Sequence, residues 1–246
     1  MNKTLIVPFI FLTFFNTYSQ NFKGIIEYGK KSVERTFTDA DKIRMKENPE
    51  KHKRFQQMHA LYAQGERKLT FELKIDKNIG VFMMKPILKS GDNKKKQLGP
   101  GPYDKAIYYN NRYRISQLNA LGELFLITKP KLIWKTQNDT KKIGEYNCFK
   151  ATTEITVNTK GRKKLITAWF TPEIPVSLGP LGYDGLPGLI LELEVYNKIY
   201  FVKKIVLNPK EKIEIETLIK GIKVTEKEFQ EMASSTVQKF KKNKGF

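Results

Sequence analysis

The segment "GYDGLPGLILELEV", Gly182 to Val195, joins a loop rich in glycine and proline to an alternation of apolar and acidic residues. From Leu191 onward, apolar residues alternate with glutamates, and this period of two is typical of a half-buried β-strand. Pro187-Gly188 predicts the centre of a type II turn, because proline sets φ near −65° and glycine accepts a positive φ at the next position. The segment therefore predicts a turn that leads directly into a strand.

The turn lies in a longer loop, residues 171–188, with four prolines and four glycines in 18 residues. Asp184-Gly185 provides a second turn signal within this loop. The loop is too apolar for an ordinary solvent-exposed connection, and it contains several leucines, Ile174, Val176 and Tyr183. We expect it to cover the open edge or mouth of a sheet, or to bind a ligand or a partner protein.

Alternation of period two recurs along the chain and predicts antiparallel strands with one buried and one solvated face. It is clearest in "KLTFELKID", residues 68–76, and in "KIEIETL", residues 212–218. Further strands are expected at residues 22–34, 78–85, 106–110, 112–118, 123–128, 131–136, 145–157, 163–171 and 199–207.

Two segments have the periodicity of helices. In residues 49–64 apolar or aromatic side chains recur at helical spacing, and Gly65 is a suitable stop. Near the C-terminus, Thr225 and Glu228 have the spacing of a capping box. The first predicted stripe consists of Phe55, Met58, His59 and Tyr62, and the second of Phe229, Met232, Thr236, Val237 and Phe240.

These elements predict a mainly β (α+β) fold with a helix near each end of the mature chain. About ten strands tend to curl or half-close around a helix, so we expect a large curved antiparallel sheet or half-open barrel. Residues 89–102, "KSGDNKKKQLGPGP", are interpreted as a long loop within a single domain, residues 20–246.

The first residues have the pattern of an export signal. Lys3 precedes the apolar run of residues 5–15, and the small residues Thr17 and Ser19 predict cleavage after Ser19. The alternative is an N-terminal membrane anchor, but a span needs about 20 apolar residues. We therefore expect an exported protein that is periplasmic or associated with the outer membrane.

The chain of 246 residues has a formal net charge of +20. Such a charge favours anionic partners, for example lipid headgroups, acidic glycans or an acidic protein face, although it also serves solubility. Nucleic acid is not expected as a partner, because the chain is predicted to be exported and lacks the signature of a nucleic-acid-binding motif.

Cys148 is the only cysteine, so no intramolecular disulfide is possible. A reactive cysteine needs a base and an electropositive setting, whereas many free cysteines are small buried hydrophobes, and both interpretations remain open.

The two histidines, His52 and His59, lie roughly 10 Å apart along a helix, too far to share one ion. No cluster has metal-ligand spacing, and we expect no metal or cofactor. The strand carboxylates alternate with apolar residues as on a solvated face: Glu192, Glu194, Glu214 and Glu216.

The string "GLPGLI", Gly185 to Ile190, resembles the hallmark of the GLPGLI family. The resemblance extends over residues 168–194 and over the upstream segment "KKIGEYNCFKA", residues 141–151. It implies an exported protein of the Bacteroidota phylum with an envelope role, since relatives are often encoded near TonB-dependent outer-membrane receptors. The family has no agreed catalytic residues, but the resemblance draws attention to Cys148 and Trp169. This chain departs from the usual spacing at Gly182, which we expect to add local freedom.

Our leading hypothesis is a non-enzymatic envelope protein in which the hallmark loop folds over the rim of a concave sheet and binds a protein, lipid or peptide. Alternatives are a lipid or lipoprotein carrier-like protein, a structural element of an outer-membrane machine, and an enzyme with a site near Cys148, Trp169 and Asp184. The candidate binding residues are Trp169, Tyr183, Asp184, Gly185, Leu186, Pro187, Gly188, Leu189 and Ile190.

Overall fold

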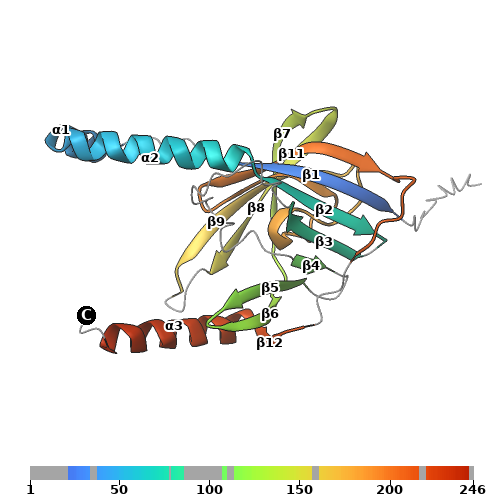
Figure 1. The fold of residues 1–246 in the computed structure, drawn as a ribbon. Coiled ribbons are helices and arrows are strands. Elements are labelled where there is room, and N and C mark those ends of the chain that lie inside the picture. The colour runs from blue at the N-terminus through green and yellow to red at the C-terminus, as the bar shows by residue number, and fades with distance from the viewer. Residues whose placement is uncertain are drawn as a thin grey trace, which may run out of the picture.

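The computed structural model shows one open sheet of twelve strands, in which β12 and β7 form the two edges (Figure 1). The structure describes residues 22–33, 38–77, 79–85, 107–109, 114–156, 161–215 and 220–243. The predicted signal segment and residues 89–102 lie outside the described residues. The strand order is β12-β6-β5-β4-β3-β2-β1-β11-β10-β9-β8-β7, and all neighbours are antiparallel except β12 and β6.

The prediction of a mainly β fold with a large curved sheet is confirmed. The strands are β1 (Lys23–Ser32), β2 (Thr70–Asp76), β3 (Ile79–Met84), β4 (Ile107–Tyr109), β5 (Arg114–Ala120), β6 (Glu123–Lys129), β7 (Lys135–Ile143), β8 (Tyr146–Thr156), β9 (Lys163–Thr171), β10 (Leu189–Val195), β11 (Lys198–Leu207) and β12 (Ile222–Thr225). The helices are α1 (Asp39–Glu47), α2 (Pro49–Arg67), the 3-10 turn η1 (Pro180–Gly182) and α3 (Glu226–Asn243).

Alternation along β2 predicts its faces correctly. Phe71, Leu73 and Ile75 are fully buried, while the residues between them are partly exposed. The Phe71 ring stacks on Phe82 at 5.7 Å between centroids and meets the Tyr200 ring edge-on at 5.3 Å. Burial of a large apolar side chain contributes about 2–3 kcal/mol, so these rings from neighbouring and distant strands form the centre of the core.

Two strand predictions are wrong. The strand expected at residues 131–136 begins only at Lys135, and the described residues 212–215 of "KIEIETL" form no strand although Ile213 is buried. An alternating pattern marks an extended chain with one buried side, but it does not ensure a hydrogen-bonded neighbour. Conversely, β12 was not predicted, because a four-residue strand that pairs in parallel carries no hairpin signal.

The C-terminal helix α3 begins at the predicted capping box. The Glu228 amide donates to the Thr225 hydroxyl at 3.2 Å, and the Thr225 amide donates to the Glu228 carboxylate at 2.7 Å. Phe229 packs edge-on against Phe125 of β6 at 5.2 Å between ring centroids, which attaches α3 to the sheet. The side chains of Val237 and Phe240 lie outside the described residues.

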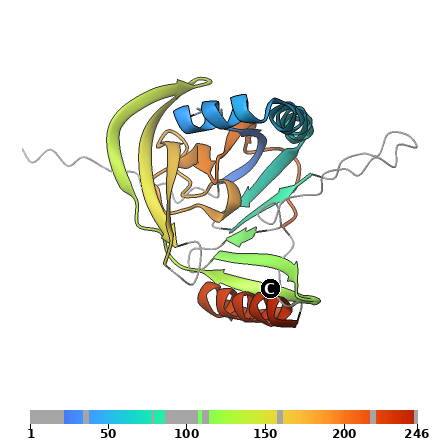
Figure 2. The same cartoon turned by 90° about the vertical axis from the view of Figure 1, so that its left-hand side faces the viewer.

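The N-terminal helix α2 begins at Pro49 as predicted but continues past Gly65 to Arg67. The preceding helix α1 was not predicted, although Thr38 and Asp41 form a capping box at its start. We call residues 39–67 the α1–α2 arm, because the two helices project from one end of the sheet (Figures 1 and 2). Neither helix buries a residue, so the expectation that the sheet curls around a helix is wrong.

The concave side is filled instead by residues 172–188, which we call the plug (Figure 2). Among its residues Ile174, Val176 and Leu186 belong to the hydrophobic core. The plug is held to the start of β10 by backbone bonds, since the amides of Leu189 and Ile190 donate to carbonyls of residues 174 and 178, both at 3.0 Å. Its apolar composition is therefore explained by burial inside the curved sheet.

The predicted type II turn at Pro187-Gly188 is wrong. The Gly188 amide donates to the Leu186 carbonyl at 2.8 Å, which closes a three-residue turn around Pro187, and Gly188 is not among the glycines with positive φ. Gly188 is required for space, because a Cβ atom there would lie 2.0 Å from the Thr171 carbonyl oxygen. The Asp184-Gly185 signal does mark left-handed backbone, with φ +92° at Gly185.

Gly188→Ala should therefore destabilise the protein by about 3 kcal/mol or more, because the methyl group meets backbone atoms that cannot move aside. Gly144→Ala is the control: its φ is +60° and nothing lies within 4 Å of the added Cβ. That change should cost only about 1–2 kcal/mol of backbone strain. Urea unfolding followed by tryptophan fluorescence measures both, and equal losses would contradict the close approach of residues 188 and 171.

Candidate functional site

Arg114, at the start of β5, is a buried charge that connects the sheet to the plug. Its side chain is 8% exposed, and its guanidinium group donates to the carbonyls of Gly182 and Pro130. Its Nε atom lies 3.4 Å from a carboxylate oxygen of Asp184. Sequence reasoning did not single out this residue, because nothing distinguishes it from the other lysines and arginines of a chain that has 45 of them.

Gly182 is thus more tightly held than its unusual position in the motif suggested. It is buried, its φ is +84°, and its carbonyl accepts the Arg114 hydrogen bond. A left-handed residue is needed to turn this carbonyl toward β5, and glycine adopts that conformation without a Cβ penalty. The expected local freedom is replaced by a defined structural contact.

Aromatic contacts hold the other side of the same turn. The Trp134 indole nitrogen donates to the Asp184 carbonyl at 2.7 Å, and its ring meets the Tyr183 ring edge-on at 6.3 Å. The Gly185 amide donates to the Ser177 hydroxyl at 2.9 Å. Arg114 therefore holds Asp184, and Trp134 holds both Tyr183 and Asp184. These contacts have a structural role, because they attach the plug to the sheet.

Burial raises the pKa of Asp184 above its ordinary value, and the nearby Arg114 charge opposes the shift without cancelling it. Desolvation of a buried carboxylate can exceed the attraction of its ion-pair partner. The ionised carboxylate is therefore a cost to the folded state, whereas the guanidinium group is needed by two carbonyls as well as by Asp184.

The two partners should accordingly respond differently to replacement. Arg114→Met removes the donor that the Gly182 and Pro130 carbonyls and the Asp184 carboxylate share, and should lower the free energy of unfolding by about 3–5 kcal/mol. Asp184→Asn should change it by less than about 1 kcal/mol near neutral pH. Both values come from urea unfolding.

The pH dependence supplies a second measurement. An acid with a raised folded-state pKa stabilises the fold below its unfolded pKa, and this contribution is lost as pH rises through the folded pKa. The stability of Asp184→Asn relative to the wild type should therefore increase from about pH 4 to pH 7. A relative stability that falls over this range would show that the ion pair dominates desolvation.

Cys148 of β8 is a fully buried thiol. Burial raises its pKa to about 11, and the Lys141 charge only partly opposes this shift. His52 and His59 lie on α2, which contacts β1, and three strands separate β1 from β8. Neither histidine is among the groups that act on the thiol pKa, so the structure places no imidazole base beside Cys148.

Trp169 and Cys148 share the neighbour Lys141. The Lys141 ammonium group is 4.4 Å from the centroid of the Trp169 ring and 2.7 Å from a Glu192 carboxylate oxygen, and Lys141 is the register partner of Cys148. The charges that act on Asp184 are those of Arg114 and Lys131, and neither acts on Cys148. The structure therefore groups Cys148 with Trp169 and gives Asp184 a separate set of partners.

Native Cys148 should resist iodoacetamide near pH 7.5, because a thiol with a pKa near 11 is thiolate in fewer than about one molecule in a thousand. Unfolding in urea should restore ordinary reactivity. A Lys135→Cys variant in a Cys148→Ala background supplies the control, since residue 135 is exposed on the edge strand β7. Native labelling of Cys148 as fast as that of residue 135 would contradict its burial.

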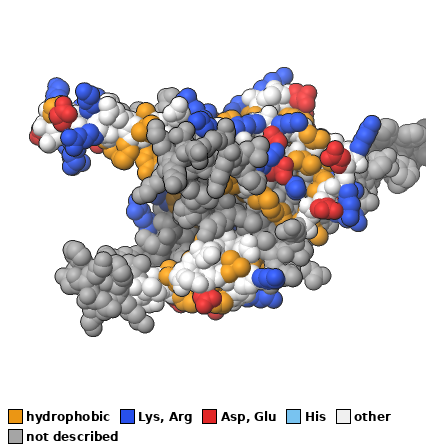
Figure 3. Space-filling model, viewed as in Figure 1, with side chains coloured by type: hydrophobic (Ala, Val, Ile, Leu, Met, Phe, Trp, Pro, Cys, Tyr) orange, Lys and Arg blue, Asp and Glu red, His pale blue; other side chains and the backbone are white. Residues whose placement is uncertain are grey.

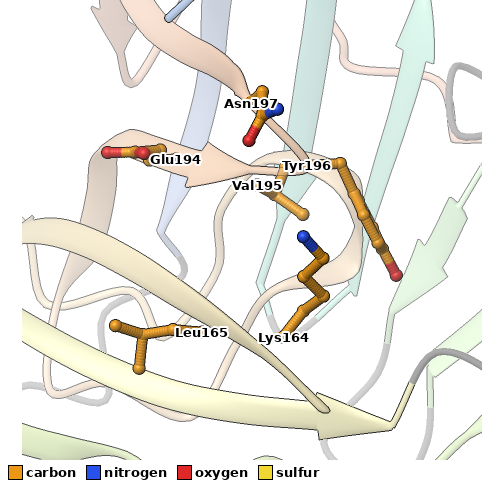
Figure 4. A pocket seen from close by; sticks show the side chains of 6 residues that line it. All are labelled: Lys164, Leu165, Glu194, Val195, Tyr196 and Asn197. Atoms are coloured by element: carbon orange, nitrogen blue, oxygen red, sulfur yellow. The ribbon is translucent and has the colours of Figure 1, made fainter. Parts of the chain in front are cut away.

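The surface has shallow depressions. One, of about 250 Å³, lies between β9 and the β10–β11 turn, where the Lys164 side chain points toward Val195 and Tyr196 (Figure 4). Another, of about 410 Å³, lies at the elbow of the α1–α2 arm and includes His52 and Phe55 in its lining. Among the described residues no group of three or more His, Cys, Asp or Glu side chains is placed to hold a metal ion.

Among the described residues, five of the eleven large apolar side chains that are exposed lie on the α1–α2 arm, which also carries basic side chains (Figure 3). Phe55, Met58, Leu61 and Tyr62 of α2 are 37%, 50%, 66% and 45% exposed, and we call these four residues the arm stripe. The predicted apolar stripe thus lies on a helix as expected, but it faces solvent and not the core. Leu61 was not predicted as part of it.

The root of the arm is fixed by a polar cluster. Ser32 of β1 donates to the Glu66 carboxylate at 2.7 Å, and Lys198 of β11 forms an ion pair with the same carboxylate. Burial alone raises the pKa of Glu66, but the hydrogen bonds from Lys198 and Ser32 outweigh it and the pKa lies below the ordinary value. The arm is therefore anchored at its C-terminal end while the stripe extends away from the sheet.

One family model matches a part of the chain that includes the plug. Residues 160–192, which include the plug, match a family model described as "Protein of unknown function (Porph_ging)". This match covers 33 of 246 residues, from 160 to 192 inclusive. No curated protein matches the chain.

Two solved structures have a similar arrangement. "Structure of PNGF-II in P21 space group" aligns with 86% of this chain at 14% identity and a TM-score of 0.47. "Structure of PNGF-II in C2 space group" aligns with 86% at 13% identity and a TM-score of 0.45. This chain spans about a third of their length, 33% and 32% respectively, and a likeness at this level carries no information on function.

Proposed function

We propose that this protein is a non-catalytic binding or accessory module of the cell envelope, and that it attaches to another envelope component through the α1–α2 arm. The export signal predicted from residues 1–19 and the family resemblance support the location. The observation that carries the proposal is the arm stripe, because four large apolar side chains are exposed on α2, which projects from the sheet. Exposed apolar surface of this kind marks interaction sites.

The hallmark loop has a different role in this proposal. Leu186, Leu189 and Ile190 are buried in the core, and Tyr28 of β1 donates its hydroxyl to the Ile190 carbonyl at 2.7 Å. These side chains are covered by the protein itself, so they support the shape of the sheet. We therefore assign the partner-binding surface to the arm and not to the hallmark loop, where the sequence motif had suggested it.

The alternatives have less support from the geometry. A lipid or lipoprotein carrier would hold its ligand on the concave side, which the plug occupies. An enzyme with Cys148 as nucleophile would need a thiolate, and burial raises the pKa of this thiol to about 11. Asp184 is engaged with Arg114, and its carbonyl accepts the hydrogen bond from Trp134.

The double variant Phe55→Ser/Leu61→Ser should lose association with isolated envelopes by about tenfold or more, since each apolar side chain buried at an interface contributes about 1–2 kcal/mol. Gln56→Ser/Ala60→Ser is the matched control, because these exposed residues lie on the opposite side of the same helix and neither is three or four residues from an arm-stripe residue. Sedimentation of envelopes with added protein measures retention.

Both double variants should keep the circular dichroism spectrum and melting temperature of the wild type within a few degrees, because α2 buries none of its residues. Equal retention of the stripe variant and the control variant would remove the arm from the binding surface. No retention of the wild type would overturn the proposed function itself.

A further inference from the structure

We propose that the component recognised by the arm is an anionic phospholipid surface, on which α2 lies in the plane of the headgroups. This inference rests on the proposed function and names the partner of the same arm. It requires that basic and apolar side chains share one exposed face of a helix, that no acidic side chain interrupts the face, and that the sheet leaves the helix accessible.

The charge pattern of α2 meets the second requirement. Residues 51–65 contain no aspartate or glutamate, but they contain Lys51, Lys53 and Arg54 together with the whole arm stripe. The nearest acids in sequence are Glu50 and Glu66, which flank this stretch. Anionic headgroups attract such a segment, whereas a mixed-charge helix surface has no preference of this kind.

Helical spacing places two of these bases with the apolar residues. Lys51 is four residues before Phe55 and Arg54 is four residues before Met58, so each base lies one turn from a stripe residue on the same side of the helix. All four side chains are exposed. Lysine and arginine can extend their apolar stems along a hydrophobic surface while the charge stays at headgroup level.

Three of the five acids of the arm have partners within the protein. Glu66 is bound by Lys198 and Ser32 at the root. On α1, Asp41 is occupied by the Thr38 cap, and Asp39 forms an ion pair with Lys42 at 2.8 Å. The other two, Glu47 and Glu50, precede residue 51, and Glu47 lines the same depression as Lys51 and Phe55. Residues 51–65 are therefore the longest stretch of the arm without an acid, and they contain the whole arm stripe.

The dimensions of α2 suit a helix that lies on a bilayer. Its 19 residues span about 28 Å, and an interfacial helix needs only to sink its apolar face to the boundary of the headgroups. Within the described parts of the chain, no helix combines the length and the apolar character needed to cross a membrane. The arm projects beyond the sheet, which leaves room for a flat surface to approach it (Figures 1 and 2).

The test uses the mature chain and sedimentation of vesicles, either of phosphatidylcholine alone or of phosphatidylcholine mixed with phosphatidylglycerol. The protein should bind the mixed vesicles at least tenfold more strongly, and binding should weaken as salt rises. Lys51→Gln/Arg54→Gln should reduce binding about 10- to 30-fold, and Phe55→Ser/Leu61→Ser about tenfold.

The charge control is Lys77→Gln/Lys210→Gln. Both lysines are exposed and lie near the end of β1 that is remote from the arm, since Lys77 bonds to the Phe22 carbonyl and residue 208 bonds to Lys23. This variant has the same net charge as Lys51→Gln/Arg54→Gln and should keep at least half of the wild-type binding. Equal losses in the two charge variants would show a general effect of net charge and overturn the inference.

The remaining outcomes separate the inference from the proposed function. If the wild type ignores anionic vesicles while its retention on envelopes still depends on Phe55 and Leu61, the partner is a protein, so the lipid inference fails and the proposed function stands. If vesicle binding is unaffected by Phe55→Ser/Leu61→Ser, the arm stripe does not touch the bilayer and the inference fails. If neither vesicles nor envelopes respond to the arm variants, both proposals fail.

Discussion

The contact between Arg114 and the plug is the interaction on which the arrangement of this molecule depends. Arg114 stands at the start of β5, in the half of the sheet that carries α3, while the plug leads into β10 in the other half. A guanidinium group that is almost wholly buried must have its donors satisfied, and the carbonyls of Gly182 and Pro130 do so. The need of this buried guanidinium group for hydrogen-bond acceptors thus fixes the position of the plug relative to β5.

The plug fills the hollow that a curved sheet of this size would otherwise leave. Twelve strands curve too widely for the two sides to touch each other, and in the described part of the chain no α-helix enters the hollow. A chain segment that fills this space must approach other backbones closely and must also turn sharply. The glycines of the plug divide between these tasks: Gly179 and Gly188 provide space against Ile190 and Thr171, whereas Gly182 and Gly185 adopt positive φ.

The structural motif and the surface that we propose for a partner are therefore separate in this protein. The most distinctive sequence, from Gly185 to Ile190, is used inside the molecule, where its leucines join the core. The surface that we assign to a partner is the arm stripe on α2, whose sequence contains no recognisable motif. The stripe is suited to binding because no strand of the described chain covers it and because residues 51–65 contain no acid. A motif that identifies a family need not mark the place where its members act.

Local patterns correctly predicted the elements whose cause is local. The period of two in β2 follows from the pleat, which sends neighbouring side chains to opposite faces, and the cap of α3 follows from donors within four residues. The same patterns failed where a neighbour in space decides the result. Residues 212–215 alternate yet have no strand partner, and β12 pairs with β6 although its sequence offers no turn toward it.

The sequence by itself determined a mainly β chain with helical segments, a single thiol and a positive charge, because each of these follows from residue type or from spacing along the chain. Only the tertiary structure decided that Arg114 meets Gly182 and Asp184, that Cys148 is buried away from both histidines, and that the arm stripe stays exposed. These are contacts between residues far apart in the sequence. They depend on the order and curvature of the strands, which no pattern in a short window records.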